Sequence, residues 1–390
     1  MKDRRLRMMF LGNIISCSSG YGVYLRDLLA FLVAEGFPVA QVAYYGLEGA
    51  PIDYKGVKIY PKMGSTWGDD AVVFDQDDFQ SHCIISMMDV WVLDPNLLRK
   101  FRNYIAYVPI DHTPPPPTVV DRLRYCYKII TFSRFGQKEL QKVGFTSTLI
   151  LEGTNCDIFK PMDKIEARKQ LKLPQDKFVF GMIGANKDNP PRKGFQQAMD
   201  AFKMFHDKHP EAGLFIHTLL QQQGGFPIMY YARFLGIENS LYAIPDYQVL
   251  VKAQHPEIAL EMNAIDCLLQ SSTNEGFGLP IIEAQSCGKP VIVNNFSSMP
   301  ELVIEGKTGF ITEIYQKWFT PLQGYACIPD TKNIYDNMEK LYAWVKKDNG
   351  QIAKDCRENI LTNYNNESIF KDKWLPTIEQ IQLDLLGPVK

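Results

Sequence analysis

The 390-residue sequence has no long apolar run, no long run of Lys and Arg and no paired cysteines at metal-binding spacing. Its eight cysteines are scattered and none belongs to a C-x-x-C pair, which is typical of reduced thiols in a cytosolic protein rather than of disulfides or zinc. The basic N-terminus MKDRRLRMMFLG contains the apolar stretch MMFL, which is too short for a signal peptide or a membrane span. We therefore expect a cytoplasmic protein, with the basic segment LLRKFR (Leu97–Arg102) as a weak indication of peripheral membrane contact.

The charge balance also argues against a polyanionic partner. Lys and Arg number 42 against 44 Asp and Glu, and no basic run is long enough to form a nucleic-acid patch. A hydrophobic content of 46% is ordinary for a folded globular protein, and 390 residues exceed what one core usually holds. The sequence thus predicts two folded domains and no nucleic-acid binding, and it leaves the oligomeric state open.

Two series of apolar strand patterns alternate with helical patterns. The first series runs from MMFLG to TLILEG, and the second runs from FVFGMIG to PVIVNN, after the polar stretch KPMDKIEARKQLKLPQDK, which we interpret as a linker. Such alternation predicts an α/β protein with two Rossmann-like, doubly wound parallel sheets whose ligands bind in a cleft at the strand ends. We assign residues 1–160 to an N-terminal domain and residues 161–366 to a C-terminal domain. Helix 367–390 could pack back on either domain, and the sequence alone does not decide which; we group it provisionally with the N-terminal domain.

The segment TNEGFGLPIIEAQSCGKPVIV places two carboxylates, Glu275 and Glu283, around a Gly-Phe-Gly loop in otherwise apolar surroundings. A helix is predicted from Pro280 to about Cys287, with Glu275 in the loop before it and Glu283 in its first turn. The loop glycines allow a ligand to approach the backbone, and free N–H groups at the helix start suit an anion or sugar oxygens. Carboxylates accept hydrogen bonds from sugar hydroxyls, so the pattern suits a nucleotide-sugar. The alternative is a capping or solvent-facing role for each glutamate.

These residues resemble the E-x7-E segment of the retaining glycosyltransferases of family four, also called glycosyltransferase group 1, which have the GT-B architecture of two Rossmann domains facing a cleft. The likeness continues through NFSSMPELVIEGKTGFI (Asn295–Ile311) and EGTNCDIFKP (Glu152–Pro161). The resemblance implies that Glu275 lies against the donor sugar and that Glu283 binds the ribose hydroxyls. It also implies that the loop amides of four residues hold sugar and phosphate: Gly276, Phe277, Gly278 and Leu279.

The family carries an Arg-then-Lys pair on the diphosphate, and this sequence has GANKDNPPRKG (Gly184–Gly194) there. Lys193 matches the family lysine, whereas Asn186 occupies the usual arginine position beside the donor. Arg192 or Lys187 would then supply the second charge. Two cations at a strand end suit a diphosphate leaving group, whose growing charge they stabilise. The alternative is a solvated pair in a loop.

In the N-terminal half, LGNIISCSSGYGVYLRDLL resembles the first glycine loop of the family, with Ser18 or Ser19 as helix cap. It is not the G-x-G-x-x-G fingerprint, which argues against a nicotinamide enzyme. The strand end YVPIDHTPPPP carries a histidine where family members place one beside the donor sugar, although a lone histidine is more often structural. The resulting candidates are Gly20, Tyr21 and Gly22 on the donor side, His112 as a catalytic group, and Asp111 and Arg134 on the acceptor side.

The segment FDQDDF (Phe74–Phe79) contains an Asp-x-Asp of the kind that metal-dependent glycosyltransferases of the GT-A architecture use, but three clustered aspartates are usually a polar turn. We read it as a turn and expect no metal and no cofactor. The resemblance implies a retaining transferase that moves a sugar from a UDP- or GDP-linked donor to a glycan, lipid or protein acceptor. Rival hypotheses are a catalytically weak sugar-binding or scaffold protein, and an epimerase or phosphorylase of the same fold.

Overall fold

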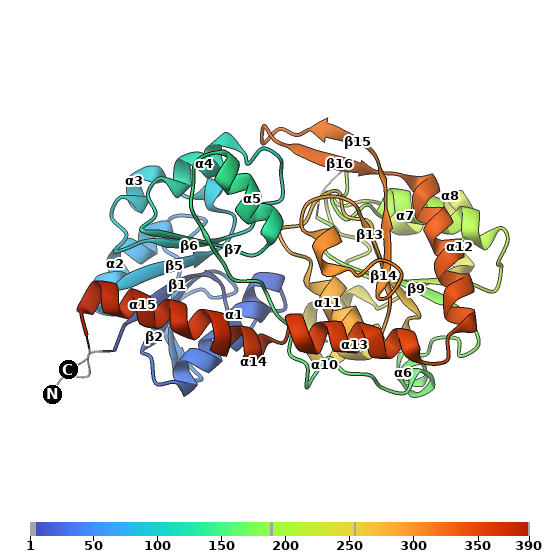
Figure 1. Ribbon diagram of the computed structural model, residues 1–390, viewed down its shortest axis with the longest axis horizontal. Coiled ribbons are helices and arrows are strands. Elements are labelled where there is room, and N and C mark those ends of the chain that lie inside the picture. Colours follow the sequence, from blue (N-terminus) through green and yellow to red (C-terminus); the bar gives the residue numbers. More distant parts are fainter. Residues whose placement is uncertain (1–4, 188–189, 253–254, 389–390) are drawn as a thin grey trace. The chain divides into compact units, whose positions relative to one another are not determined.

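The chain forms two compact units, each built on its own sheet. The computed structural model describes residues 5–187, 190–252 and 255–388. Unit 1 contains Met1–Gly153, Pro321–Gly324 and Asn366–Lys390, and unit 2 contains Thr154–Thr320 and Tyr325–Asn365 (Figure 1). The contact boundary thus falls after Gly153 rather than after residue 160, and the C-terminal segment groups with unit 1.

Unit 1 is a doubly wound sheet in the strand order β3-β4-β2-β1-β5-β6-β7-β8, parallel except for the β3–β4 pair. Strand β1 is buried along its whole length, as expected where helices cover both faces of a parallel sheet. The strands are β1 (Met8–Asn13), β2 (Val39–Tyr45), β3 (Ile52–Tyr54), β4 (Val57–Pro61), β5 (Cys83–Met87), β6 (Ile105–Val108), β7 (Lys128–Thr131) and β8 (Thr148–Leu149). The helices are α1 (Gly20–Ala34), α2 (Asp69–Asp78), η1 (Val90–Val92), α3 (Pro95–Leu98), α4 (Pro117–Leu123), α5 (Arg134–Lys142), α14 (Asn366–Ile369), the π-helical η4 (Phe370–Trp374) and α15 (Leu375–Leu386).

The C-terminal segment α14–η4–α15 lies beside α1 (Figure 1). Phe370 stacks on Phe31 of α1 at a ring-centroid distance of 5.0 Å. The buried indole N–H of Trp374 donates to the Tyr24 hydroxyl at 3.0 Å, so the buried polar group has a partner. These aromatic contacts explain why a segment that follows unit 2 in the sequence belongs to unit 1.

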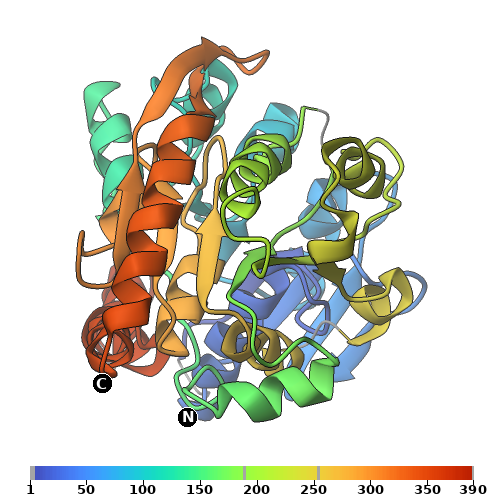
Figure 2. The same ribbon diagram turned by 90° about the vertical axis from the view of Figure 1, so that its right-hand side faces the viewer.

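Unit 2 contains a six-stranded, fully parallel sheet in the order β11-β10-β9-β12-β13-β14, and a separate hairpin β15–β16. Phenylalanines of α7 and apolar residues of α12 share one core with β9 and β10, and α12 runs along this sheet (Figure 2). The strands are β9 (Val179–Ile183), β10 (Gly213–His217), β11 (Leu241–Ala243), β12 (Cys267–Gln270), β13 (Val291–Asn294), β14 (Gly309–Thr312), β15 (Ile314–Phe319) and β16 (Tyr325–Pro329). The helices are α6 (Lys164–Leu171), α7 (Phe195–His206), α8 (Ile228–Leu235), η2 (Glu238–Ser240), α9 (Asp246–Lys252), α10 (His255–Ala264), α11 (Leu279–Ser286), η3 (Met299–Leu302), α12 (Thr331–Lys347) and α13 (Gln351–Asn363).

Two polar stretches that the sequence analysis interpreted as a linker and a turn are helical. The presumed linker contains α6, whose Arg168 is fully buried and pairs with Asp266 at 2.7 Å. The presumed turn FDQDDF continues α2, and its acidic side chains have partners on neighbouring elements: Asp77 pairs with Arg102, and Asp78 accepts from Lys58. A pattern of charges did not reveal these helices because their partners lie far away in the sequence.

Candidate active site

The sheet of unit 2 reverses its winding direction between β9 and β12. From β9 the chain builds β10 and β11 on one side, and it then returns to place β12 and β13 on the other. In α/β sheets, ligands bind beyond the carboxyl ends of the strands beside such a reversal. Here the described loop residues are 184–187 and 190–193 after β9 and 271–278 after β12, and they carry the predicted cations and the first glutamate.

Short polar contacts fasten the two loops to each other. The Thr273 N–H donates to the Arg192 carbonyl at 2.8 Å, and the Ser271 hydroxyl donates to the Gly194 carbonyl at 3.1 Å. Gly194 begins α7 with φ +64°, and a Cβ there would lie 2.0 Å from the Ser271 carbonyl oxygen. Because that approach excludes any side chain, glycine is required at this position. The aliphatic part of the Lys193 side chain packs on Gly184, which directly follows β9.

Glu275 is the centre of the polar network. It is 6% exposed. Its Oε1 accepts from the Lys193 ammonium at 2.5 Å, the Ser272 hydroxyl at 2.6 Å and the Gln270 amide at 2.9 Å, and its Oε2 accepts from Arg192 at 3.1 Å. A carboxylate has about four acceptor positions, two per oxygen. Oε1 is therefore saturated by protein donors, whereas Oε2 has room for a ligand hydroxyl.

The charges of this network determine the protonation of its members. Burial alone would raise the pKa of Glu275, but the Lys193 and Arg192 charges and the hydrogen bonds from Lys193 and Ser272 lower it to about 2. The pKa of Lys193 is lowered, because burial and the neighbouring Arg192 charge outweigh the attraction of Glu275. At neutral pH Glu275 is thus a fixed anion held by cations that can also face an anionic ligand.

The loop after Glu275 is oriented by two serines that follow β13. The Ser298 hydroxyl lies 2.9 Å from the carbonyl oxygen of Glu275 and 2.6 Å from that of Phe277, and the Glu275 N–H donates to Ser297 at 2.9 Å. With these carbonyl oxygens held on one side, the amides point elsewhere. Within residues 5–187, 190–252 and 255–388, no acceptor is seen for the N–H groups of Gly276, Phe277, Gly278 and Leu279. A run of such N–H groups at a helix start suits phosphate or sugar oxygens.

The second glutamate lies in α11, which begins at Leu279 with Pro280 in its first turn. Glu283 is the fifth residue of this helix, so the expectation that it belongs to the first turn was wrong by one position. Its side chain is 8% exposed and makes no hydrogen bond or ion pair with the described residues. Burial raises the pKa of Glu283 to about 8. A buried carboxyl group without a protein partner is a strong candidate for ligand binding.

Asn186, which the sequence places at the position of the family arginine, has protein partners for its side chain. It is buried, and its amide donates to the carbonyls of Leu219 at 3.3 Å and Phe226 at 2.9 Å. Its side-chain oxygen accepts from the Phe226 N–H at 2.7 Å. Asn186 therefore fastens the loop after β10. Arg192, placed on Glu275, is the second cation of the site, whereas Lys187 is exposed.

Sequence reasoning missed four residues that hold Glu275 or its loop: Gln270, Ser272, Ser297 and Ser298. A signal was available for the first two, since Gln270 is the last residue of β12, Ser272 follows that strand closely, and both precede the glutamate by a few residues. The two serines have no such signal. They contact the loop from more than twenty positions along the chain, and a serine pair is common in any turn.

In unit 1, the corresponding reversal of the sheet lies between β1 and β5. Ser19 caps α1 by accepting from the Gly22 N–H at 3.1 Å, and a Cβ at Gly22 would lie 2.7 Å from the Ile14 carbonyl oxygen. The Tyr21 hydroxyl donates to Asp89 after β5 at 3.3 Å. The glycine-loop candidates and a carboxylate thus meet at the carboxyl edge of this sheet.

His112 follows β6 and is 5% exposed. Its Nδ1 lies 2.6 Å from Asp111 Oδ1, which directs Nε2 away from that carboxylate. Both side chains line a small cavity with Asp89, Trp91 and Leu322, the last from the hairpin tip that groups with unit 1. Arg134, the first residue of α5, is exposed, and Ser133 caps that helix as predicted.

Among the described residues, no group of three or more His, Cys, Asp and Glu side chains is placed to hold a metal ion. None of the helices in residues 5–187, 190–252 and 255–388 is both long enough and apolar enough to span a bilayer.

The site residues of unit 2 fall inside a known domain. Residues 163–318 match the family model described as "Glycosyl transferases group 1". This segment is similar to glycosyltransferase group 1 domains. It contains Lys193, Glu275 and Glu283, together with the serines that orient the loop.

Sequence relatives match less than half of the chain. The D-inositol 3-phosphate glycosyltransferase of Streptomyces avermitilis is 31% identical over 166 residues, which are 41% of this chain and 34% of that protein. The trehalose synthase of Thermococcus litoralis is 27% identical over 176 residues, 45% of this chain and 38% of that protein. The chain thus spans well under half the length of these curated relatives.

Solved structures resemble nearly the whole chain. Sucrose-phosphate synthase from Thermosynechococcus elongatus gives a TM-score of 0.79 at 17% identity, covering 97% of this chain and 99% of the other. Anabaena HepE in complex with UDP-glucose gives 0.71 at 18% identity, covering 98% and 100%. These likenesses and the two parallel sheets confirm the predicted GT-B fold, with the residues that match the glycosyltransferase group 1 model inside unit 2.

Proposed function

We propose that the protein is a retaining glycosyltransferase that moves a sugar from a nucleotide-diphosphate sugar to a hydroxyl acceptor. The observation that carries this proposal is the Glu275 cluster, in which a buried carboxylate held by Lys193 and Arg192 precedes a loop of four amides that have no acceptor among the described residues. Amides and cations suit a diphosphate, and the remaining capacity of Glu275 Oε2 suits a sugar hydroxyl. The UDP-glucose bound to Anabaena HepE supports the same class of donor.

In this proposal departure of the diphosphate is the step that the site promotes. Lys193 has three N–H donors, so it can contact a phosphate oxygen while it stays on Glu275. The loop amides and Arg192 would stabilise the charge that develops on the leaving group, in a buried setting where such interactions are strong. No metal ion is required, because the cations of the chain occupy that role. The proposal also includes the assignment of Glu275 and Glu283 to an E-x7-E motif and the membership of the chain in glycosyltransferase family four.

The acceptor side is assigned to unit 1, through Asp111 and Arg134, and His112 is the catalytic group proposed to lie beside the donor sugar. A glycan, lipid or protein acceptor fits equally with these residues, and UDP and GDP are both open as the carrier. In the rival hypothesis of a binding protein, the same donor site would hold a nucleotide-sugar without turnover. An epimerase of this fold would change the sugar without any acceptor.

The direct test is a screen of UDP- and GDP-sugars for thermal stabilisation, followed by a transfer assay with the donor that binds. We expect one donor to raise the melting temperature and to release its nucleoside diphosphate when an acceptor is present. Retention of the anomeric configuration would be read by NMR of the product. Stabilisation without turnover across a broad acceptor panel would favour the binding protein, and an altered sugar without acceptor would favour the epimerase.

Donor binding should depend on pH through Glu283. Because its pKa is raised to about 8 from 4.5, the folded chain retains a proton that the unfolded chain loses. The stability from this proton is complete below pH 4.5 and is lost as the pH rises to about 8. A ribose hydroxyl that donates to the ionised carboxylate favours deprotonation. We therefore expect donor affinity to increase by up to about tenfold per pH unit as the pH approaches 8.

The matched variant is Glu283→Gln, which keeps the size of the side chain and removes its titration. Calorimetry at pH values from roughly 6 to 8 measures its donor affinity. This affinity should be weaker than that of the wild type and nearly independent of pH. Its melting temperature should exceed that of the wild type at alkaline pH. A wild-type affinity that does not change with pH, or a variant with the same slope, would exclude hydroxyl binding by an ionised Glu283.

A further inference from the structure

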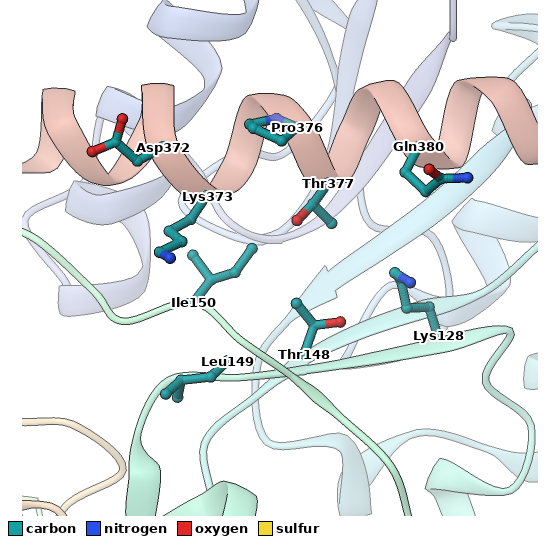
Figure 3. Close-up of a pocket in the computed structure, with 9 residues that line it drawn as sticks. All are labelled: Lys128, Thr148, Leu149, Ile150, Asp372, Lys373, Pro376, Thr377 and Gln380. Atoms are coloured by element: carbon teal, nitrogen blue, oxygen red, sulfur yellow. The ribbon is translucent and has the colours of Figure 1, made fainter.

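A second hollow lies in unit 1, between the edge of its sheet and the C-terminal helical segment. Its volume is about 260 Å³. The wall on the sheet side belongs to β7, β8 and the residue that follows, and the other wall belongs to η4 and α15 (Figure 3). The lining residues are Lys128, Thr148, Leu149, Ile150, Asp372, Lys373, Pro376, Thr377 and Gln380. All of them belong to unit 1, whereas Lys193, Glu275 and Glu283 belong to unit 2.

The polar groups of this hollow are mainly hydrogen-bond donors. Lys128 projects from the sheet and Lys373 from the helix, and their side chains point into the same gap (Figure 3). Within the described part of the chain neither ammonium group forms an ion pair, and no hydrogen bond is made by the hydroxyls of Thr148 and Thr377. The Asp372 carboxylate is turned away from the gap in the same view. Two cations and two hydroxyls thus line one hollow, to which Asp372 also contributes.

The two walls are held together beside the hollow. Asp384 of α15 accepts from the Tyr127 hydroxyl at 3.1 Å, and its other oxygen accepts from the Gln380 amide at 2.7 Å. Tyr127 directly precedes Lys128, so this contact fixes the sheet-side lysine relative to the helix. The floor is apolar, with Ile150 buried. A preformed space of this kind requires little ordering when a ligand binds.

We propose that this hollow binds a small phosphate monoester. Phosphate oxygens accept charge-assisted hydrogen bonds from ammonium groups and further bonds from hydroxyls. The volume of 260 Å³ is below that of most drug-sized pockets, so it suits a phosphate with a short polyol rather than a nucleotide. The Gln380 side chain lines the same space and is placed to contact the polyol. The donor nucleotide is assigned to unit 2, so this is a separate site.

Binding there would connect Lys128 and Thr148 of the sheet with Lys373 and Thr377 of the C-terminal segment. A ligand that binds the folded form alone stabilises it by mass action. The C-terminal segment is the last of three parts that make up unit 1, and its attachment depends on contacts with the rest of that unit. The site would therefore make the stability of unit 1 depend on the concentration of a phosphorylated metabolite or on a phospholipid headgroup.

The test uses the full chain and compares inorganic phosphate, glycerol 3-phosphate and sulfate at equal ionic strength. We expect glycerol 3-phosphate to raise the melting temperature saturably and to bind in calorimetry. The double variant Lys128→Met/Lys373→Met should weaken that binding by about tenfold or more. Lys371→Met is the matched control, because Lys371 lies on the same segment, pairs with Glu367 at 2.6 Å and does not line the hollow.

Two further arms locate the source and the site. Flotation with phosphatidylcholine vesicles that contain phosphatidic acid distinguishes a lipid headgroup from a soluble ester, and lysine-dependent binding in either arm supports the site. Lys193→Met, which alters the donor site, should leave glycerol 3-phosphate binding intact. Thr377→Val provides a milder change if the double variant does not fold. Absence of binding in both arms, or binding that persists in the lysine and threonine variants, would overturn the proposal.

Discussion

Glu275→Gln is expected to lower the rate of sugar transfer by about a thousandfold. The substitution keeps the shape of the side chain and removes the charge on which Lys193 and Arg192 converge. Both cations would then lack their shared anion and would bind the diphosphate in altered positions. The acceptor capacity that we assign to the donor sugar is lost at the same time. Initial rates with saturating donor, measured on folded protein, test this expectation.

The same substitution also affects stability, which must be separated from catalysis. Lys193 is largely buried, and removing one partner of a buried ion pair destabilises a fold by about 3–5 kcal/mol. The double variant Lys193→Met/Glu275→Gln removes both partners, so it should recover stability relative to Glu275→Gln. Transfer should stay low in the double variant. If activity returned together with stability, the role of Glu275 would be structural.

A second control is Glu358→Gln on α13, which changes an exposed glutamate of the same unit. This variant should have wild-type rates and a wild-type melting temperature, because surface substitutions away from such contacts change stability little. A comparable loss of transfer in Glu358→Gln would indicate that the assay reports general damage rather than the Glu275 network.

The fold was predictable from the sequence because its signals are local. Strands such as β9 are apolar throughout, as parallel strands buried on both faces must be, and helix starts carry caps such as Ser19 and Ser133. The position of Glu275 at the end of a central strand was also predictable, since the strand and the following glycine loop adjoin it in sequence. Alternation of strands and helices then determines the class of fold.

The chemistry around Glu275 was less predictable because it depends on contacts between distant residues. The sequence analysis assigned Lys193 to the diphosphate, whereas the structure places its ammonium on Glu275, 82 positions away. Asn186 was assigned to the donor from its alignment, and in the structure its side chain fastens the loop after β10. Pairings of this kind depend on the order of strands in the sheet, and the pattern along the chain does not encode that order directly.

Gly194→Ala is expected to be the most damaging small substitution in unit 2. The added Cβ would lie 2.0 Å from the Ser271 carbonyl oxygen, and φ is +64°, so the residue would be both strained and in contact with backbone. The Ser271 oxygen belongs to the backbone and not to a flexible side chain, so the end of β12 and the start of α7 would have to move apart. We expect a loss of about 3 kcal/mol or more in unfolding free energy. Transfer should fall by about a hundredfold, because Lys193 adjoins the displaced residue.

Gly236→Ala is the matched control, since Gly236 has a similar φ of +70° but no heavy atom within 4 Å of an added Cβ. It carries the backbone strain without the collision and should lose about 1 kcal/mol. Calorimetric unfolding of both variants, with and without the donor identified by screening, separates the two effects. Because a chain of two units need not unfold in one step, the transition that the donor shifts is the one to compare. Equal losses of unfolding free energy in Gly194→Ala and Gly236→Ala would mean that the loops of Lys193 and Glu275 are not held as closely as the Ser271 contact requires.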